Sequence, residues 1–302
     1  MITPLAIAFT PNYIVPAATM LKSLLDASTG SFRVICLLTE EIPAEMLQML
    51  TRMGQGRLTF DCISLKGRLD GYYTDARYSE AASFRLLLPE LLPDYDKILY
   101  LDCDVIIRQD MVALYRDTDI GDNYLAAIYE APIEGQAERI KALGCTPGQY
   151  FNSGVLLMNL RQMREESVSE RLLRACEKEY MEFPDQDALN QVCQGRVLPL
   201  NPVYNSIRTF FLPQYKKDFC IIYSEDLWKQ VQHKGNIHYT GGKPWNIFSV
   251  MFGAWWKVFY TLPEEIRELM HPKGKIGFLA SLYKLGVGRL IDRGVTGYRK
   301  LK

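Results

Sequence analysis

The sequence predicts an α/β fold built around a parallel β-sheet. Segments with strand-like and helix-like patterns alternate through the N-terminal third of the chain, an order typical of parallel sheets. The apolar run at residues 98–101 leads directly into Asp102-Cys103-Asp104. A strand buried on both faces has this kind of short apolar run, and its carboxyl end opens where α/β sheets bind ligands. The 302 residues, 48% of them hydrophobic, are enough to form a large core.

The first four strands and three helices follow in order along the chain. The strands are short runs rich in branched apolar and aromatic residues. The expected strands are residues 5–9, 32–38, 58–63 and 97–101. The expected helices are residues 16–25, 43–52 and 79–88. Pro16 and Pro43 support two of the helix starts, because proline is compatible with the first turn of a helix.

Further strand and helix patterns follow downstream. Residues 150–160 combine a polar turn with an apolar strand, and residues 162–180 form an amphipathic segment that predicts a helix. Another helix is expected to open at Asp185-Gln186-Asp187, where the acids lie at the positive end of the helix dipole. An ordinary charged helix cap explains Asp185 equally well.

Asp102 and Asp104 are the first candidates for chemistry. They are two residues apart, so both carboxylates would share one face at the end of the strand. Neighbouring carboxylates repel each other unless a cation joins them. Hard divalent ions such as Mn²⁺ and Mg²⁺ take oxygen ligands and leave positions open for a substrate phosphate. The pair therefore predicts a metal-bound nucleotide, with a solvated, aspartate-capped turn as the alternative for this motif alone.

His238, one of three histidines, has the surroundings that best suit a binding site. A short strand leads to it, and Gly241, Gly242, Lys243 and Trp245 follow. Glycines allow backbone amides to approach a phosphate closely, and a lysine neutralises the phosphate charge. The imidazole is suited to be a third metal ligand. An isolated histidine is more often structural, but this combination with two aspartates favours the metal site.

The composition limits the class of protein. The seven cysteines are scattered and never form a C-x-x-C pair, so neither a disulfide framework nor a zinc cluster is favoured. No basic leader precedes the N-terminal apolar run, and no stretch reaches the roughly 18 apolar residues of a membrane span. We therefore expect a cytoplasmic protein, either free or peripheral on the inner face of the plasma membrane.

Residues 271–302 are expected to form a basic tail after a single catalytic domain at residues 1–270, which no repeat or low-complexity linker divides. The tail holds eight Lys/Arg and one acid, which leaves 27 basic and 34 acidic side chains in the domain. Its apolar residues recur at helical intervals at Ile276, Leu279, Tyr283, Val287 and Leu290. This pattern suits peripheral membrane contact, and a helix packed on the domain is the alternative. Confinement of positive charge to the tail argues against nucleic-acid binding.

Four motifs, taken in order and spacing, resemble glycosyltransferase family 8. They are KILYLDCDV at 97–105, FNSGV at 151–155, DQDALN at 185–190 and HYTGGKPW at 238–245. The resemblance covers roughly residues 4–260 and includes bacterial lipopolysaccharide and lipooligosaccharide α-galactosyltransferases and α-glucosyltransferases. It is greatest to the lipooligosaccharide α-galactosyltransferases. It implies a GT-A fold, with a Rossmann-like mixed central sheet flanked by helices and a basic C-terminal helical tail.

The resemblance also implies an activity and a set of site residues. The activity is retaining transfer of galactose or glucose from a UDP-sugar to a glycan or lipid-linked saccharide acceptor, in bacterial surface polysaccharide or lipopolysaccharide synthesis. The implied ligands of Mn²⁺ or Mg²⁺ are Asp102, Asp104 and His238. The implied nucleotide-binding residues are Ala8, Thr10, Asn12, Tyr13, Arg85, Asp102, Cys103, Gly241 and Lys243. The implied catalytic residues are Asn152, Asp185 and Gln186, and Glu130 falls near the acceptor.

One departure from the family pattern concerns the uracil end of the donor. In relatives the first strand continues into an acidic residue that contacts uracil, whereas here Thr10 and Pro11 follow Phe9. Thr10 still offers a hydroxyl group for a pyrimidine edge, so UDP remains the expected nucleotide. Gln186 holds the position that relatives place opposite the leaving group. An amide is a weak nucleophile, so we favour attack on the same face as the departing UDP over a covalent intermediate.

Two other functions compete with this interpretation. A nucleotidyltransferase would begin with a glycine-rich basic phosphate loop, and residues 8–14 contain neither glycine nor lysine. A non-catalytic nucleotide- or glycan-binding subunit of a polysaccharide assembly complex is the second alternative. Such a subunit has no need of all four of Asp102, Asp104, His238 and Lys243, so their presence favours the enzyme.

Overall fold

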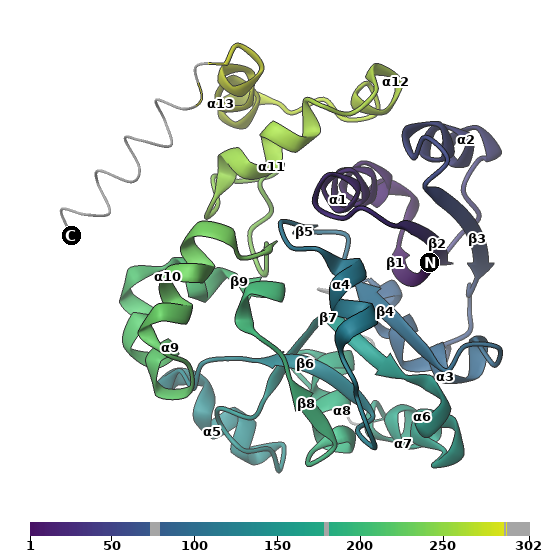
Figure 1. The fold of residues 1–302 in the computed structure, drawn as a ribbon, viewed down its shortest axis with the longest axis vertical. Helices are drawn as coiled ribbons and strands as arrows, with labels where there is room; N and C mark the ends of the chain where they lie inside the picture. Colours follow the sequence, from purple (N-terminus) through teal and green to yellow (C-terminus); the bar gives the residue numbers. More distant parts are fainter. Residues whose placement is uncertain (73–78, 178–180, 287, 289–302) are drawn as a thin grey trace.

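The computed structural model describes residues 1–72, 79–177, 181–286 and 288. Within these residues, seven strands form one central sheet in the order β3-β2-β1-β4-β7-β6-β8 (Figure 1). The strands are β1 (Ile2–Phe9), β2 (Ser31–Leu38), β3 (Leu58–Ser64), β4 (Lys97–Leu101), β6 (Leu125–Tyr129), β7 (Phe151–Asn159) and β8 (Val197–Pro199). β7 is antiparallel to both of its neighbours, and the other pairs are parallel. The predicted mixed sheet is confirmed.

The order of the strands reverses at β1. β1 pairs along its whole length with β2 on one side, and Leu5 and Ala6 pair with Leu99 and Tyr100 of β4 on the other. The carboxyl ends of β1 and β4 therefore lie next to each other at one edge of the sheet. This is the position where open α/β sheets bind ligands, and Asp102 follows β4 directly at this edge.

Helices cover both faces of the sheet, because successive side chains of each buried strand point to opposite faces. Leu99 and Leu101 of β4 belong to one core, and Ile98 and Tyr100 belong to the other. The first core includes residues of α1 (Ile14–Ala27), α2 (Ala44–Met53), α4 (Met111–Asp117) and α11 (Phe252–Phe259). The second includes η2 (Glu80–Leu87), α3 (Leu88–Leu91), α6 (Leu160–Glu165), α7 (Val168–Ala175) and α8 (Pro184–Cys193).

A small second sheet carries His238 to the edge of the large one. It has the order β5 (Val105–Ile106), β10 (Ile237–His238) and β9 (Ser206–Ile207). His238 pairs with Val105, the residue after Asp104, and the Tyr239 amide donates to the Asp104 carbonyl at 3.1 Å. Two helices, α9 (Lys216–Ile222) and α10 (Glu225–Lys234), lie on the β9 side (Figure 1).

The remaining elements are short and lie between these layers or at their margins. The helices are α5 (Glu134–Ala142), α12 (Glu264–Arg267) and α13 (Gly274–Lys284). The single-turn 3₁₀ helices are η1 (Pro11–Tyr13), η3 (Pro202–Tyr204), η4 (Arg208–Phe211) and η5 (Pro213–Tyr215).

Three predicted helices differ from the observed ones. The helix expected at residues 79–88 is largely the 3₁₀ helix η2, and the helix expected from Pro16 begins at Ile14. The helix expected at residues 162–180 is divided into α6 and α7, because Ser167 between them has a φ of 51°, which an α-helix cannot continue. The end of that prediction, residues 178–180, lies outside the described residues.

The helix α13, which forms the described part of the tail, packs on α11. Tyr283 is buried, and its ring centroid lies 6.0 Å from that of Phe252. Phe278 and Leu285 are 67% and 72% exposed. The stripe residues Val287 and Leu290 lie outside the described residues. None of the helices that the structure describes is long and apolar enough to cross a membrane.

Candidate functional site

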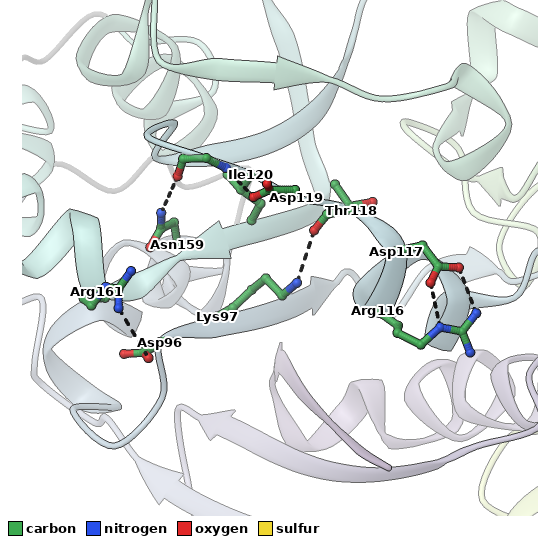
Figure 2. Close-up of a pocket in the computed structure, with 10 residues that line it drawn as sticks. Asp96, Lys97, Arg116, Asp117, Thr118, Asp119, Ile120, Asn159 and Arg161 are labelled. Carbon is green, nitrogen blue, oxygen red and sulfur yellow. Dashed lines mark hydrogen bonds and ion pairs between the residues drawn. The ribbon is translucent and has the colours of Figure 1, made fainter.

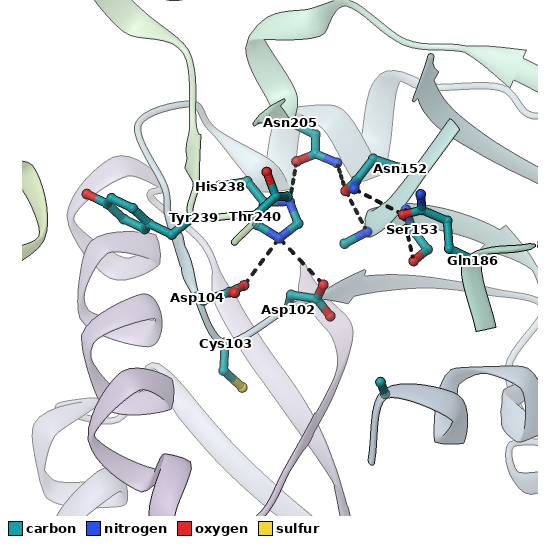
Figure 3. Close-up of polar contacts among 12 residues, drawn as sticks. Asp102, Cys103, Asp104, Asn152, Ser153, Gln186, Asn205, His238, Tyr239 and Thr240 are labelled. Atoms are coloured by element: carbon teal, nitrogen blue, oxygen red, sulfur yellow. Dashed lines mark hydrogen bonds and ion pairs between the residues drawn. The ribbon is translucent and has the colours of Figure 1, made fainter. Parts of the chain in front are cut away.

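Asp102, Asp104 and His238 converge at the carboxyl end of β4 (Figure 3). One possible ligand atom from each residue lies within 4.8 Å of the other two. His238 Nε2 is 3.2 Å from Asp104 Oδ1 and 3.6 Å from Asp102 Oδ2. The position of Asp102 is set by its amide, which donates to the Gly154 carbonyl of β7 at 2.8 Å. The predicted triad is therefore assembled from the turn after β4 and from β10, which are far apart in sequence.

Each carboxylate of the triad has one oxygen with a fixed partner and one that faces His238. Asp102 Oδ1 accepts from Arg85 Nη2 at 2.9 Å and from the Tyr100 hydroxyl at 3.0 Å, which leaves Oδ2 toward the imidazole. Asp104 Oδ2 accepts from Lys243, and Asp104 Oδ1 is buried without a hydrogen bond from any described residue. Two free carboxylate oxygens and one imidazole nitrogen are a donor set that suits a divalent cation.

Gly154 leaves the space in which the triad meets. A Cβ atom at this position would lie 2.2 Å from His238 Cε1 and 2.7 Å from Asp102 Oδ2. Both distances are well inside van der Waals contact, so any side chain here would displace the ligands. The glycine of the FNSGV motif is thus required by close approach, and not by an unusual backbone angle.

Lys243 lies beside Asp104 and shapes the charge of the site. Its Nζ also donates to the Tyr239 carbonyl at 2.7 Å. Burial by itself would raise the pKa of Asp104, but the adjacent Lys243 ammonium lowers it well below its usual range. Burial opposes the charged form of Lys243, yet the contact with Asp104 raises its pKa. Asp104 and Lys243 therefore form a buried ion pair at the place where the cation ligands meet.

Arg85 connects the triad to the predicted sugar pocket. It is 3% exposed, and its Nε lies 3.2 Å from Asp185 Oδ2 while its Nη2 bonds to Asp102. Its Nη1 donates to the Ser153 carbonyl at 2.5 Å. Burial works against the charged form of Arg85, but Asp102 and Asp185 raise its pKa. Burial raises the pKa of Asp185, and Arg85 partly opposes this effect.

A chain of amides joins His238 to Asn152 and Gln186, two of the predicted catalytic residues (Figure 3). His238 Nδ1 lies 2.9 Å from Asn205 Oδ1, and Asn205 Nδ2 donates to Asn152 Oδ1 at 2.8 Å. Asn152 Nδ2 donates to Gln186 Oε1 at 3.0 Å and to Glu130 Oε1 at 3.2 Å. Gln186 Nε2 also donates to Glu130 Oε1 at 3.2 Å, and burial raises the pKa of the Glu130 carboxyl group.

The predicted nucleotide-binding residues of the first loop lie next to the triad. The Cys103 thiol points away from His238 and donates to the Ala8 carbonyl at 3.8 Å (Figure 3). The Thr10 hydroxyl donates to Asn12 Oδ1. Tyr13 packs edge-on against Trp245 with ring centroids 5.8 Å apart, and burial raises the pKa of its hydroxyl.

Gly241 is exposed at the start of the turn that carries Lys243. Its φ of 104° is a conformation that favours glycine. This turn brings Lys243 back toward Asp104, so the predicted residues of both loops lie around one edge of the sheet.

Sequence reasoning missed four side chains that hold the site together: Tyr100, Tyr150, Ser153 and Asn205. Tyr150 donates to Asp187 Oδ1 at 2.5 Å and accepts from Gln186 Nε2 at 3.1 Å. Tyr150 and Ser153 stand in or beside a motif that the sequence did single out. Asn205 gave no local signal, because its partners are 33 and 53 residues away.

A separate polar pocket of about 400 Å³ lies at the opposite end of β4 (Figure 2). It is lined by Asp96, Lys97, Arg116, Asp117, Thr118, Asp119, Ile120, Gly121, Asn159 and Arg161. Lys97 Nζ donates to the carbonyls of Tyr115 and Thr118 at 2.7 and 3.2 Å, and Arg116 pairs with Asp117 at 2.6 Å. Its basic groups are thus already paired within the protein, and it contains none of the predicted site residues.

Comparison with known proteins assigns most of the chain to one family. Residues 4–248 match the family model described as Glycosyl transferase family 8. The chain is 28% identical over 176 residues to General stress protein A of Bacillus subtilis (strain 168), which covers 56% of this chain and 60% of that protein. It is 31% identical over 182 residues to the Lipopolysaccharide 1,2-glucosyltransferase of Escherichia coli (strain K12), which covers 57% of this chain and 51% of that protein. These alignments thus span between half and two thirds of the relatives.

A solved structure extends the likeness to most of the chain. The crystal structure of galactosyltransferase LgtC in complex with donor and acceptor sugar analogs superposes with a TM-score of 0.70 at 27% identity. The match covers 89% of this chain and 100% of that one. The expected GT-A fold is confirmed by this likeness.

Proposed function

Because the chain belongs to glycosyltransferase family 8, we propose that it is a metal-dependent retaining hexosyltransferase. The proposed reaction moves galactose or glucose from a UDP-sugar to a glycan acceptor, in the synthesis of a bacterial surface polysaccharide or lipopolysaccharide. The observation that carries the proposal is the meeting of Asp102 Oδ2, Asp104 Oδ1 and His238 Nε2 beside Lys243. The names of the E. coli glucosyltransferase and of LgtC support the choice of sugars.

The three residues of the triad fit a divalent cation, with Mn²⁺ as the first choice and Mg²⁺ as the second. Asp104 Oδ1 is buried without a hydrogen-bond donor among the described residues, which is costly unless a cation pairs with it. Gly154 keeps the space between the ligands clear. A bound cation would supply Lewis-acid stabilisation of the charge that develops on UDP.

Different residues of the protein would bind the diphosphate and the uridine of the donor and orient the carboxylates beside it. Lys243 would leave Asp104 and donate to the diphosphate, which stabilises the leaving group electrostatically. The uridine would be held by Thr10, Asn12 and Tyr13, and Ala8 and Cys103 would line the base of the nucleotide site. The backbone of Gly241 would contact the diphosphate. Arg85 would keep Asp102 and Asp185 oriented, because it already contacts both carboxylates.

Contacts of Gln186 support attack on the same face as the leaving UDP. Gln186 Oε1 already accepts from Asn152 Nδ2 at 3.0 Å and from the Ser153 amide at 3.1 Å. Two lone pairs are thereby engaged, so none is left for a covalent bond to the sugar. Gln186 would instead stabilise positive charge on the anomeric carbon, while Asp185 and Asn152 orient sugar hydroxyls. Glu130, which bonds to both amides, would lie toward the acceptor.

A non-catalytic nucleotide- or glycan-binding subunit is the alternative from another functional class. It would bind UDP-sugar with the cation and release no UDP. The buried Asp104–Lys243 pair favours the enzyme. A subunit that only binds has no leaving diphosphate to stabilise, so it gains little from a lysine beside the cation ligands.

The tail is proposed to hold the enzyme at an anionic membrane, where a lipid-linked saccharide acceptor resides. We place the boundary between the catalytic domain and this tail at residues 270 and 271. Phe278, Lys275 and Lys284 are exposed on α13, and Lys273 and Leu285 are exposed at its two ends. Apolar side chains next to lysines suit insertion at an anionic lipid surface, where each basic residue contributes about 1 kcal/mol.

Sedimentation with liposomes tests the membrane proposal without removing the packed helix. The variant Phe278→Ser/Leu285→Ser should lose binding to anionic vesicles, and high salt should weaken wild-type binding. Ile221→Ser is the matched control, since Ile221 is 66% exposed on α9 instead. Equal sedimentation of all three proteins, or equal binding to neutral vesicles, would contradict the proposal.

Activity is tested by incubating the protein and Mn²⁺ with a panel of UDP-sugars and measuring release of UDP. Asp102→Asn, Asp104→Asn and His238→Ala should each abolish release, and combining them should cost no more than one alone, because they act as a unit. Asp96→Asn is a control at the far end of β4, where the side chain is 73% exposed. Full activity in excess chelator would refute the metal assignment, and binding without turnover would favour the subunit.

A further inference from the structure

The state of His238 depends on which of its ring nitrogens carries the proton. Nε2 faces Asp102 and Asp104, and Nδ1 faces Asn205 Oδ1 at 2.9 Å. A neutral imidazole has one donor and one acceptor nitrogen, and only the acceptor can bind a cation. The partner of Nδ1 therefore decides whether Nε2 is available.

A backbone amide fixes the orientation of the amide chain. The Gly154 N–H donates to Asn152 Oδ1 at 3.1 Å, and a backbone N–H is always a donor. The atom of Asn152 on that side must therefore be the oxygen. The same atom lies 2.8 Å from Asn205, which must present its amide nitrogen to it. The Asn205 oxygen is consequently the atom that faces His238 Nδ1.

An amide oxygen can only accept, so His238 Nδ1 is the protonated nitrogen. We propose that Asn205 is a positioning residue that holds His238 with Nδ1–H bound and the Nε2 lone pair directed at the cation. Asn205 is fully buried, with 0% exposure, so water does not compete for these bonds. Partners of this kind orient metal-binding histidines and make them more basic.

The same residue links the cation site to the sugar pocket. Asn205 Nδ2 holds Asn152, and Asn152 Nδ2 holds Gln186 and Glu130. One side chain thus presents an acceptor to His238 and a donor to the pocket. The two functions can be separated by Asn205→Asp. A carboxylate has the same shape as the amide and still accepts from His238, but it has no N–H group to donate to Asn152. The inference rests on the proposed function only in that the triad must bind a cation.

Binding of Mn²⁺ without donor sugar, followed by electron paramagnetic resonance, tests the proposal apart from catalysis. Asn205→Ala should weaken Mn²⁺ binding by about 10–100-fold. Asn205→Asp should bind Mn²⁺ within a few-fold of wild type, because its carboxylate still accepts the Nδ1 proton. The same Asn205→Asp variant should transfer sugar more slowly, because the donor to Asn152 is lost. If Asn205 had only a structural role, both variants would lose Mn²⁺ affinity and transfer rate together.

Asn236→Ala is the matched control. Asn236 is also 0% exposed, and its side chain bonds to the backbone of Arg108, Gln109 and Tyr204. Its loss should lower the melting temperature and leave Mn²⁺ affinity unchanged. Unchanged Mn²⁺ affinity in Asn205→Ala, or equal weakening in Asn205→Asp, would overturn the proposal. Failure of the wild-type protein to bind Mn²⁺ would overturn the metal assignment itself and this inference with it.

Discussion

Replacing Lys243 with alanine should change cation binding and turnover in opposite directions. In the structure the Lys243 ammonium bonds to Asp104 Oδ2, and their side chains are only 22% and 10% exposed. A cation that binds Asp104 must displace or tolerate this ammonium group. A charge-assisted hydrogen bond contributes about 1.5–3 kcal/mol, which corresponds to about one to two decades in an equilibrium constant. Without the competing ammonium, Mn²⁺ should bind the nucleotide-free protein tighter by that factor.

Turnover should fall by a similar factor, because the ammonium that stabilises the departing diphosphate is also lost. Mn²⁺ affinity is measured by electron paramagnetic resonance near neutral pH, and transfer by release of UDP from UDP-galactose and UDP-glucose. Lys275→Ala, an exposed lysine of α13, is the control and should change neither quantity. Weaker or unchanged Mn²⁺ binding by Lys243→Ala would refute the competition, and unchanged transfer would place Lys243 outside the site.

Three further changes test other parts of the site. Gly154→Ala should abolish Mn²⁺ binding, because its Cβ would collide with His238 and Asp102, whereas Gly135→Ala, with no atom within 4 Å of its Cβ, should bind normally. Gln186→Ala should slow transfer yet leave measurable activity, and a glycosyl adduct on residue 186 in mass spectrometry would contradict same-face attack. Burial raises the folded-state pKa of Glu130, so the folded protein holds this proton more tightly than the unfolded chain does. The folded protein therefore loses stability as pH rises from the unfolded-state pKa of Glu130 through its folded-state pKa. Glu130→Gln should flatten that decline in thermal melts, and an unchanged pH profile would contradict the assignment.

Local sequence patterns were sufficient for the strands β1 to β4 and β7 and for the acidic end of β4, but they did not indicate β6 or β8 or the antiparallel direction of β7. Burial of β4 on both faces needs a short apolar run, and a hydrophilic pair after such a run marks where the strand leaves the core. The sequence therefore located Asp102 and Asp104 correctly. The FNSGV and DQDALN segments were recognised as motifs, but nothing in them indicated that Gly154 would leave space for His238 or that Gln186 Oε1 would be fully bonded.

The division of the helix expected at residues 162–180 has a different cause. Amphipathic periodicity records which residues are buried, but not whether the axis changes direction between them. The left-handed Ser167 turns the chain so that α6 and α7 each bury their own apolar residues against the second core. A single residue in an uncommon backbone conformation leaves no periodic signal, so the break is decided by packing.

The sequence by itself determined the strands up to β4 and the strand β7, the acidic pair at the end of β4, the histidine-glycine-lysine segment and the difference in charge between residues 1–270 and 271–302. These features depend on residue type and on spacing within one segment, which the order of the chain records directly. The tertiary structure alone decided that β10 pairs with β5 to bring His238 to Asp104, that Lys243 bonds to one oxygen of Asp104 and leaves the other free, and that Asn205 faces His238. Hydrogen bonds between distant residues depend on distance and direction in three dimensions, and both are set only when the two sheets and their helices pack together.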